Sequence, residues 1–329
     1  MRPILEVRGL SIEAGSESRP IPIVQEVSFS VTAGSTLAIV GESGCGKSMT
    51  ALSLMRILPE PGVRISAGEI RFDDEDLVTA SEQRMQELRG NIISIIFQDP
   101  IASLNPIQTI GDQIIEVIRT HRSVSKREAR SRAIELLRSV RLPDAERRIN
   151  YYAHRLSGGM CQRVMIAMAM AGAPRVLIAD EPTTALDTTV QAQVMALLRK
   201  AQTETGTAII LITHNLAAAA EAAENVAVMY AGRIIEHGPV RDIFLAPAHP
   251  YTKGLLGAIP DDADRDGDVA KLTEIPGNVP RPGTLPEGCA FEPRCKNSQA
   301  RCRQERPDLF REGNRLVACF YPDSGTIAQ

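Results

Sequence analysis

The sequence is short of aromatic residues and contains no tryptophan. Phe, Trp and Tyr together make up 4% of the 329 residues. Proteins that hold single-stranded nucleic acid stack its bases on aromatic rings, so this class of function is disfavoured. Basic charge is not in excess either, because 37 Lys and Arg stand against 40 Asp and Glu and the net charge is −3. Both absences argue against a chain that binds DNA or RNA directly.

Long apolar segments are also missing. The first ten residues, MRPILEVRGL, have no hydrophobic core of the length that a secretory signal needs. The richest apolar stretch, VMIAMAMAGAP at residues 164–174, is too short to span a bilayer. We therefore expect a soluble chain whose attachment to a membrane goes through a partner.

A phosphate-binding pattern, G-x-x-x-x-G-K-[ST], begins at Gly41. An apolar strand precedes it and a helical segment follows, which is the context that a genuine phosphate loop requires and a mere glycine turn does not. Backbone N–H groups of such a loop converge on the β- and γ-phosphates. Lys47 would contact the same phosphates, and the Ser48 hydroxyl would ligate Mg²⁺. The residues expected to bind ATP are Gly41, Glu42, Ser43, Gly44, Cys45, Gly46, Lys47, Ser48 and Met49.

Two carboxylates, Asp180 and Glu181, end the apolar run VLIA at residues 176–179. Ligands of open α/β sheets bind at the carboxyl edge of the strands, where such side chains gather. Adjacent carboxylates behind a buried strand are costly without a nearby cation, which argues against an acidic turn of no consequence. We expect Asp180 to hold Mg²⁺ through water and Glu181 to act as the general base for the attacking water.

A second glycine turn, LSGGM at residues 156–160, opens a helical segment whose N-terminus offers free N–H groups and a positive dipole end. Phosphate loop, glycine turn and acid pair, in this order, resemble the ATP-binding-cassette (ABC) family of ATPases. In that family the turn completes the site of the other protomer. The resemblance implies that Ser157, Gly158 and Gly159 grip the γ-phosphate bound by a partner in a head-to-tail ATPase dimer.

The resemblance also gives roles to two polar residues at strand ends. Gln98 follows the strand at 91–97, and would contact Mg²⁺ and the attacking water as the Q-loop glutamine. His214 ends the strand at 207–213, and would contact the γ-phosphate as the switch histidine. TALD, at 184–187, matches the loop that crosses the dimer interface. The expected catalytic residues are thus Glu181, His214 and Gln98.

Two positions depart from the family pattern. The aromatic ring that stacks on adenine is expected near Ala14, yet no aromatic residue precedes Phe29. The sequence therefore predicts weaker adenine binding, or binding through an aliphatic residue such as Ile12. Asn215 follows the switch histidine where relatives usually carry Asp, and this puts the coupling of the site to its partner in question.

The C-terminal part of the sequence indicates which branch of the ABC family the chain resembles. HPYT (249–252) and IPGNVPRPGTLPEGCAFEPRC (275–295) look like the dipeptide/oligopeptide importer ATPases, as does FQDPIASLNP (97–106). This implies an ATP-hydrolysing subunit on the cytoplasmic face of the cell membrane. Its partners would be a second ATPase subunit (a paralogue or the same chain), two transmembrane permeases and an extracytoplasmic substrate-binding protein. Import of nickel, glutathione or an opine remains an alternative, as does a soluble ABC ATPase acting on nucleic acid or ribosomes.

Four of the six cysteines, Cys289, Cys295, Cys302 and Cys319, follow the spacing C-x5-C-x6-C-x16-C. In a reducing cytoplasm such a cluster indicates a metal rather than disulfides. Zinc is the common choice for four thiolates, but zinc sites usually contain C-x2-C knuckles and none occurs here. In the family the pattern implies a [4Fe–4S] cluster. We expect it to clamp the tail rather than to perform redox chemistry.

The predicted fold is α/β, a P-loop NTPase with a RecA-like parallel sheet. An antiparallel β subdomain, a helical subdomain at about residues 100–170 and a small cysteine-rich extension would complete it. The expected domains are an ABC ATPase domain at 1–245 and a peptide-importer-type extension at 246–329 that carries the iron–sulfur cysteines.

Overall fold

A computed structural model describes residues 2–16, 18–183, 188–258 and 275–323. Its residues form two compact units. The first comprises residues 1–5, 31–36 and 72–212, and the second comprises residues 6–30, 37–71 and 213–329. Each unit is described by itself.

A sheet with strand order β11-β12-β10-β9-β3 forms the frame of the second unit. Strand β3 runs parallel to β9, with Leu37 opposite Asn225, whereas β9 and β10 form an antiparallel hairpin. The hairpin turns at Ala231 and Gly232, both with positive φ. The bounds are β3 Thr36–Val40, β9 Asn225–Tyr230, β10 Arg233–Pro239, β11 Phe310–Glu312 and β12 Arg315–Val317.

A further set of strands in this unit lies in the order β2-β1-β4. Apolar side chains alternate with polar ones along β1, and Leu10 and Ile12 are completely buried on its inner face. The bounds are β1 Leu5–Ala14, β2 Ile21–Val31 and β4 Val63–Phe72.

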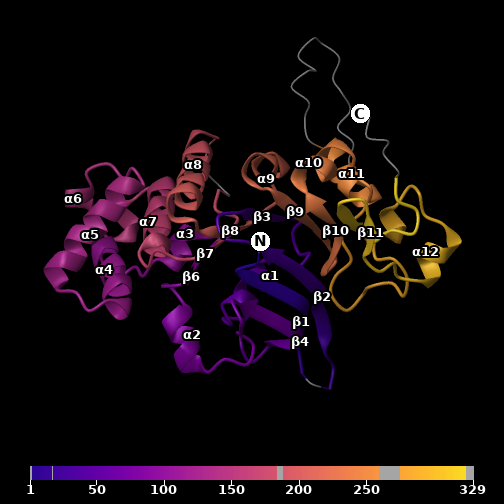
Figure 1. Ribbon diagram of the computed structural model, residues 1–329, viewed down its shortest axis with the longest axis horizontal. Helices are drawn as coiled ribbons and strands as arrows, with labels where there is room; N and C mark the ends of the chain where they lie inside the picture. The colour runs from indigo at the N-terminus through magenta and orange to yellow at the C-terminus, as the bar shows by residue number, and fades with distance from the viewer. Residues whose placement is uncertain (1, 17, 184–187, 259–274, 324–329) are drawn as a thin grey trace, which may run out of the picture. The chain divides into compact units, whose positions relative to one another are not determined.

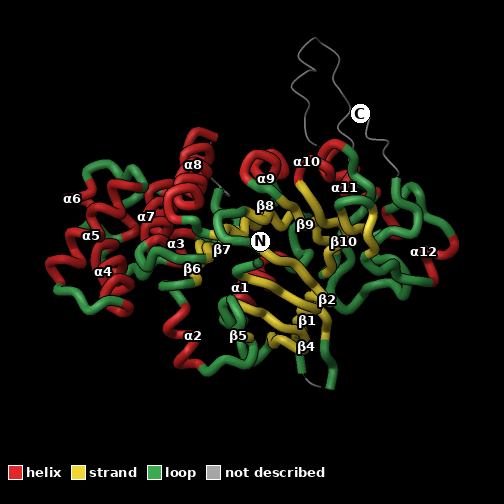
Figure 2. The backbone as a smooth tube through the Cα atoms, in the orientation of Figure 1, coloured by secondary structure: helices red, strands yellow, loops and turns green. Residues whose placement is uncertain are grey.

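The helices of the second unit are short. Between α11 and α12 the described chain has no regular element except one 3-10 turn, and Figure 2 draws the surroundings of α12 largely as loop. The bounds are α1 Lys47–Leu54, α9 Leu216–Ala222, α10 Val240–Leu245, α11 Pro250–Gly257, η3 Glu292–Arg294 and α12 Ala300–Gln304.

Three parallel strands organise the first unit. Strand β7 pairs with β6 on one side and with β8 on the other, and every residue of β7 and β8 is buried. Continuous apolar runs are typical of parallel strands that are covered on both faces. The elements are β5 Glu75–Asp76, α2 Glu82–Leu88, β6 Ile93–Ile96, β7 Val176–Asp180, α8 Thr188–Thr205 and β8 Ala208–Thr213.

A group of helices in the same unit lies within the range of about residues 100–170 where the sequence predicts a helical subdomain. Figure 1 shows α4, α5, α6 and α7 together in magenta, and α5 begins at the capping box that Ser125 and Glu128 form. The bounds are α3 Pro100–Ser103, α4 Ile110–His121, α5 Lys126–Ser139, α6 Ala145–Arg148, η1 Ala153–Arg155 and α7 Gly158–Met170. None of the helices in the described ranges is both long and apolar enough to cross a membrane.

Candidate functional site

The loop between β3 and α1 has the geometry of a phosphate cradle. Gly44 and Gly46 have positive φ, and Gly46 is the N-cap of α1 without a side chain that caps the helix. The first N–H groups of α1 therefore point toward the loop rather than to a capping side chain. The tip at Ser43 and Gly44 is exposed. These features suit an anion at the helix N-terminus.

The backbone of this loop lies directly against the β9–β10 hairpin. A Cβ atom on Gly41 would lie 2.3 Å from the carbonyl oxygen of Met229, so only glycine fits there. At the other end of the loop, the N–H of Gly232 donates to the carbonyl of Cys45 at 3.0 Å. The hairpin thus sets the position of the loop.

The side chain of Lys47 curls back over the loop. Its Nζ donates to the carbonyl oxygens of Gly41 at 2.8 Å and Glu42 at 2.9 Å, and lies 3.7 Å from the sulfur of Cys45. Burial raises the pKa of the Cys45 thiol, which keeps it neutral beside the ammonium group. The structure therefore places the one cation of the motif at the centre of the loop, where phosphate oxygens would be bound.

In the first unit, two of the predicted catalytic residues meet. Asp180 and Glu181 follow the buried strand β7 and are 5% and 9% exposed. The Nε2 of Gln98 donates to Oε2 of Glu181 at 2.9 Å. Glu181 has a φ of 47°, and its N–H donates to Ile212. The sequence placed both residues after strands, but it did not predict this hydrogen bond between them.

The LSGGM turn lies at the start of α7. Ser157 is the N-cap of this helix, and its hydroxyl accepts a hydrogen bond from the N–H of Met160 at 3.4 Å. Ser157 and Gly158 are exposed, and a Cβ on Gly158 would meet nothing within 4 Å. Small exposed residues leave the helix N-terminus accessible to an external anion.

His214 and Asn215 come directly after β8. Both residues belong to the second unit, and His214 is exposed. The Oδ1 of Asn215 accepts from the N–H of Ala218 at 3.1 Å and caps α9. Asn and Asp cap helices about equally well. Asn215 therefore retains the capping function that an aspartate would have there, which sequence reasoning missed.

One expectation about adenine is wrong. Ile12 was offered as an aliphatic platform, but it is completely buried in the core and no base can reach it. Ala14, where the aromatic ring was expected, is half-buried at the end of β1. The segment Thr184–Asp187, matched to the interface loop, lies outside the described residues.

The four C-terminal cysteines line one pocket, together with His249 and Phe291 among others. Burial raises the pKa of the Cys289 and Cys295 thiols, and raises the pKa of Cys319 to about 11. Within the described ranges, no group of three or more His, Cys, Asp or Glu side chains is arranged to hold a metal ion. The sequence thus predicted that the cysteines gather, while a metal site at this place is not established.

Two residues that sequence reasoning did not assign contact the phosphate loop. The hydroxyl of Tyr251, in the HPYT motif, accepts a hydrogen bond from the N–H of Glu42, and Arg294 forms an ion pair with the Glu42 carboxylate. The HPYT motif was visible in the sequence, but nothing in it indicates this contact.

Comparison with known proteins identifies relatives of the whole chain. The family model "ABC transporter" matches residues 24–184, and "Oligopeptide/dipeptide transporter, C-terminal region" matches residues 235–302. A putative peptide import ATP-binding protein of Brucella melitensis is 50% identical, over 96% of this chain and 94% of its own length. The oligopeptide transport ATP-binding protein AppD of Bacillus subtilis is 47% identical, over 99% of both chains. The dipeptide transport ATP-binding protein DppD of Haemophilus influenzae is 46% identical, over 97% of this chain and 96% of its own.

Solved structures of similar fold are ATP-binding cassettes. A dimeric post-hydrolysis state of the cassette MJ0796, bound to ADP and Pi, aligns with a TM-score of 0.65 and 26% identity, over 72% of this chain and 99% of that one. CbiO1 of Clostridium perfringens, part of an ABC transporter complex, aligns with a TM-score of 0.63 and 29% identity, over 74% of this chain and 92% of that one. The predicted P-loop fold is thereby confirmed.

Substitution of Gly41 tests how the hairpin positions the loop. Because the new Cβ of Gly41→Ala would lie 2.3 Å from a backbone oxygen, the loop must shift, and we expect a loss of about 1–3 kcal/mol in the free energy of unfolding. Denaturant unfolding measures it. The control is Gly158→Ala, whose Cβ has open space. Equal stability of the Gly41→Ala variant and the parent chain would show that the loop is not held by β9.

Proposed function

The chain belongs to the ABC transporter family, in its dipeptide/oligopeptide importer branch, and from this premise we propose that it hydrolyses ATP to drive the import of di- and oligopeptides. The observation that carries the proposal is the pairing of an ABC cassette at residues 24–184 with the oligopeptide/dipeptide C-terminal region at 235–302. Relatives named for peptide transport cover nearly the whole chain at 46–50% identity. These comparisons favour peptides over nickel, glutathione or an opine, and over a nucleic acid or ribosome.

The partners follow from the same family. The ATPase works on the cytoplasmic face of the inner membrane with two permeases, a second ATPase subunit and an extracytoplasmic substrate-binding protein. The exposed LSGGM turn supports pairing of two cassettes, since Ser157, Gly158 and Gly159 are accessible to the γ-phosphate held by another subunit. The dimeric cassette among the similar structures supports it as well.

ATP binds at the phosphate loop of residues 41–49. Lys47 leaves the loop carbonyls for the β- and γ-phosphate oxygens, and the N–H groups of α1 take the remaining phosphate oxygens. His214 contacts the γ-phosphate. Ser48, Gln98 and Asp180 are the residues that would hold Mg²⁺, which, when bound, offsets the negative charge of the triphosphate.

Hydrolysis requires a base beside the attacking water. Glu181 accepts the proton of the water while the water oxygen bonds to the γ-phosphorus, and the bond from that phosphorus to the β–γ bridging oxygen breaks to release ADP. The hydrogen bond from Gln98 holds one carboxylate oxygen of Glu181 in place. This contact supports a role for Gln98 in orienting the base as well as in binding the cation.

The cysteine pocket is proposed to hold a [4Fe–4S] cluster through Cys289, Cys295, Cys302 and Cys319, with zinc as the alternative. The proposal is supported by the donor set, since four thiols of the kind that hold such a cluster line one pocket in a loop-rich segment. Burial raises the pKa of Cys289, Cys295 and Cys319, which keeps these three thiols protonated without a cation, so binding would release protons and order the segment. When bound, the cluster would link the four cysteines covalently and so hold the chain between Cys289 and Cys319 in place.

Replacement of the base tests the catalytic assignment. Glu181→Gln retains the size of the side chain but cannot accept a proton, so we expect kcat to fall about 10²–10⁴-fold while ATP still binds. Steady-state hydrolysis and retention of labelled ATP measure the two effects. Glu204→Gln, at an exposed position of α8, is the matched control. Hydrolysis by Glu181→Gln at the parent rate would refute the role of Glu181.

The cysteine assignment has a direct chemical test. Protein purified without oxygen should be brown and contain about four iron and four sulfide per chain. Replacing Cys295 by Ser should remove the colour, whereas Cys161→Ser, a buried cysteine of α7, should retain it. A colourless protein with one zinc per chain would assign the pocket to zinc, and a colourless protein without metal would refute both ions.

A further inference from the structure

The C-terminal extension reaches the phosphate loop through Tyr251. This residue lies on α11 and is completely buried. Its hydroxyl accepts a hydrogen bond from the backbone N–H of Glu42 at 3.0 Å. Tyr251 and Glu42 belong to the same compact unit although 209 residues separate them. The extension therefore binds one backbone donor of the loop. This hydrogen bond fixes the direction of the peptide group between Gly41 and Glu42.

A second contact involves the side chain of Glu42. Nη1 of Arg294 lies 3.1 Å from Oε2 of Glu42, and the Arg294 side chain is only 5% exposed. The same guanidinium is held by the carbonyl oxygen of Pro276 at 2.8 Å, that of Ile275 at 3.4 Å and the hydroxyl of Tyr230 at 3.4 Å. Arg294 is thus held by groups of the extension and of β9, and it offers Glu42 a cation in a defined position.

Aromatic rings join these contacts to the cysteine segment. The ring of Tyr230 lies 4.7 Å from Tyr251 and 5.3 Å from Phe291, and Tyr251 lies 5.4 Å from Phe291. Phe291 stands between Cys289 and Cys295 in the sequence, and all three rings belong to one buried cluster. A shift of the cysteine segment must therefore move Tyr251 or Arg294, because close-packed cores transmit displacement.

The negative charge of Glu42 links the contacts of Arg294 and Tyr251 to the binding of nucleotide. Glu42 lies in a loop that binds a polyanion, and its Oε1 is buried with no hydrogen-bond partner in the part of the chain that the structure describes. Arg294 offsets the negative charge through Oε2. Without Arg294, the half-buried carboxylate of Glu42 would be unpaired in the loop that binds the triphosphate and would repel it.

We propose that Arg294 and Tyr251 are positioning residues that set the affinity of the phosphate loop for ATP by holding Glu42. Neither side chain contacts the reacting atoms. The C-terminal extension, whose Cys-rich segment carries Arg294, is thereby part of the nucleotide site. The proposal concerns ATP binding alone and stands whether the transported solute is a peptide or not.

Two substitutions in the full-length chain test whether the unpaired charge of Glu42 weakens ATP binding: one removes the cation, and the second then removes the carboxylate charge. Arg294→Met should raise the dissociation constant of a fluorescent ATP analogue about tenfold, because it leaves the Glu42 carboxylate unpaired. Adding Glu42→Gln to that variant removes the charge, and should return the constant to within about twofold of Glu42→Gln alone. Tyr251→Phe should raise it about fivefold, because the N–H of Glu42 loses its acceptor.

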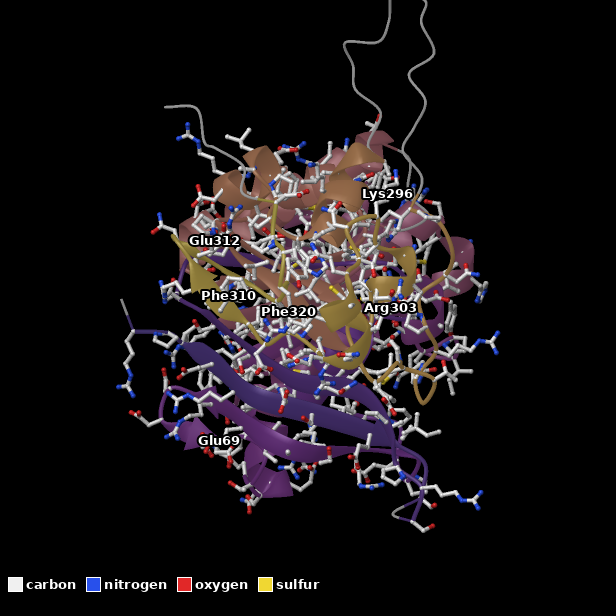
Figure 3. The ribbon with its side chains drawn as sticks, turned by 90° about the vertical axis from the view of Figure 1, so that its right-hand side faces the viewer. Glu69, Lys296, Arg303, Phe310, Glu312 and Phe320 are labelled. Atoms are coloured by element: carbon white, nitrogen blue, oxygen red, sulfur yellow. The ribbon has the colours of Figure 1, made fainter. Side chains whose placement is uncertain are left out.

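Steady-state kinetics separate positioning from loss of structure. Because the loop binds ATP in the ground state and the transition state alike, we expect KM for ATP to rise with kcat at saturating ATP unchanged within about twofold. Arg303→Met is the matched control; Figure 3 labels Arg303 on the yellow C-terminal ribbon, where it donates to Glu292 at 3.0 Å. It should leave KM unchanged.

Three results would overturn the proposal. One is an unchanged dissociation constant in Arg294→Met, and the second is a double variant that binds ATP no better than Arg294→Met. The third is a fall in kcat at constant KM, which indicates a smaller folded fraction and a purely structural role. Should Arg294→Met fail to fold, Tyr251→Phe carries the test, since it removes a single oxygen atom, and an unchanged KM in that variant would refute the proposal.

Discussion

The close seating of the phosphate loop on the β9–β10 hairpin is the constraint on which the rest of the site depends. Gly41 lies so close to the backbone of β9 that no residue with a Cβ atom fits there. The N–H of Gly232 donates to the carbonyl of Cys45. With both ends fixed, the N–H groups of α1 occupy set positions before nucleotide arrives. Preorganised donors lose little freedom on binding, and this is how a short loop can hold a highly charged ligand.

The proposed catalysis adds a second requirement, which Glu181 at the end of β7 would meet. A carboxylate must be buried enough to be a useful base and oriented enough to act on one water. Glu181 is 9% exposed, which gives the burial, and it accepts a hydrogen bond from Gln98, which gives the orientation. Asp180, one residue earlier, lies at the same edge of the sheet, where strand-end ligands of α/β proteins gather.

Much of this could be predicted from the sequence because the signals are local. The loop pattern, the strand-end positions of Gln98 and Glu181, and the hairpin at Gly232 each follow from a short stretch of residues. The Tyr251 and Arg294 contacts could not be predicted, since they join residues 209 and 252 positions apart in the chain. The role of Ile12 was predicted wrongly for a different reason. Alternation in a strand indicates that one face is buried, but it does not show which residue of the exposed face could contact adenine. The cysteine spacing likewise predicted a cluster without fixing the positions of the thiols.

The proposed ATPase is complete only as a pair, because the turn at residues 157–159 would complete the ATP site of another subunit. The rate of ATP hydrolysis per subunit, measured against protein concentration alongside the molecular mass in solution, tests this claim most directly. The account predicts a rate that rises with concentration in parallel with the dimer fraction. A full and constant rate from a chain that remains strictly monomeric would contradict it.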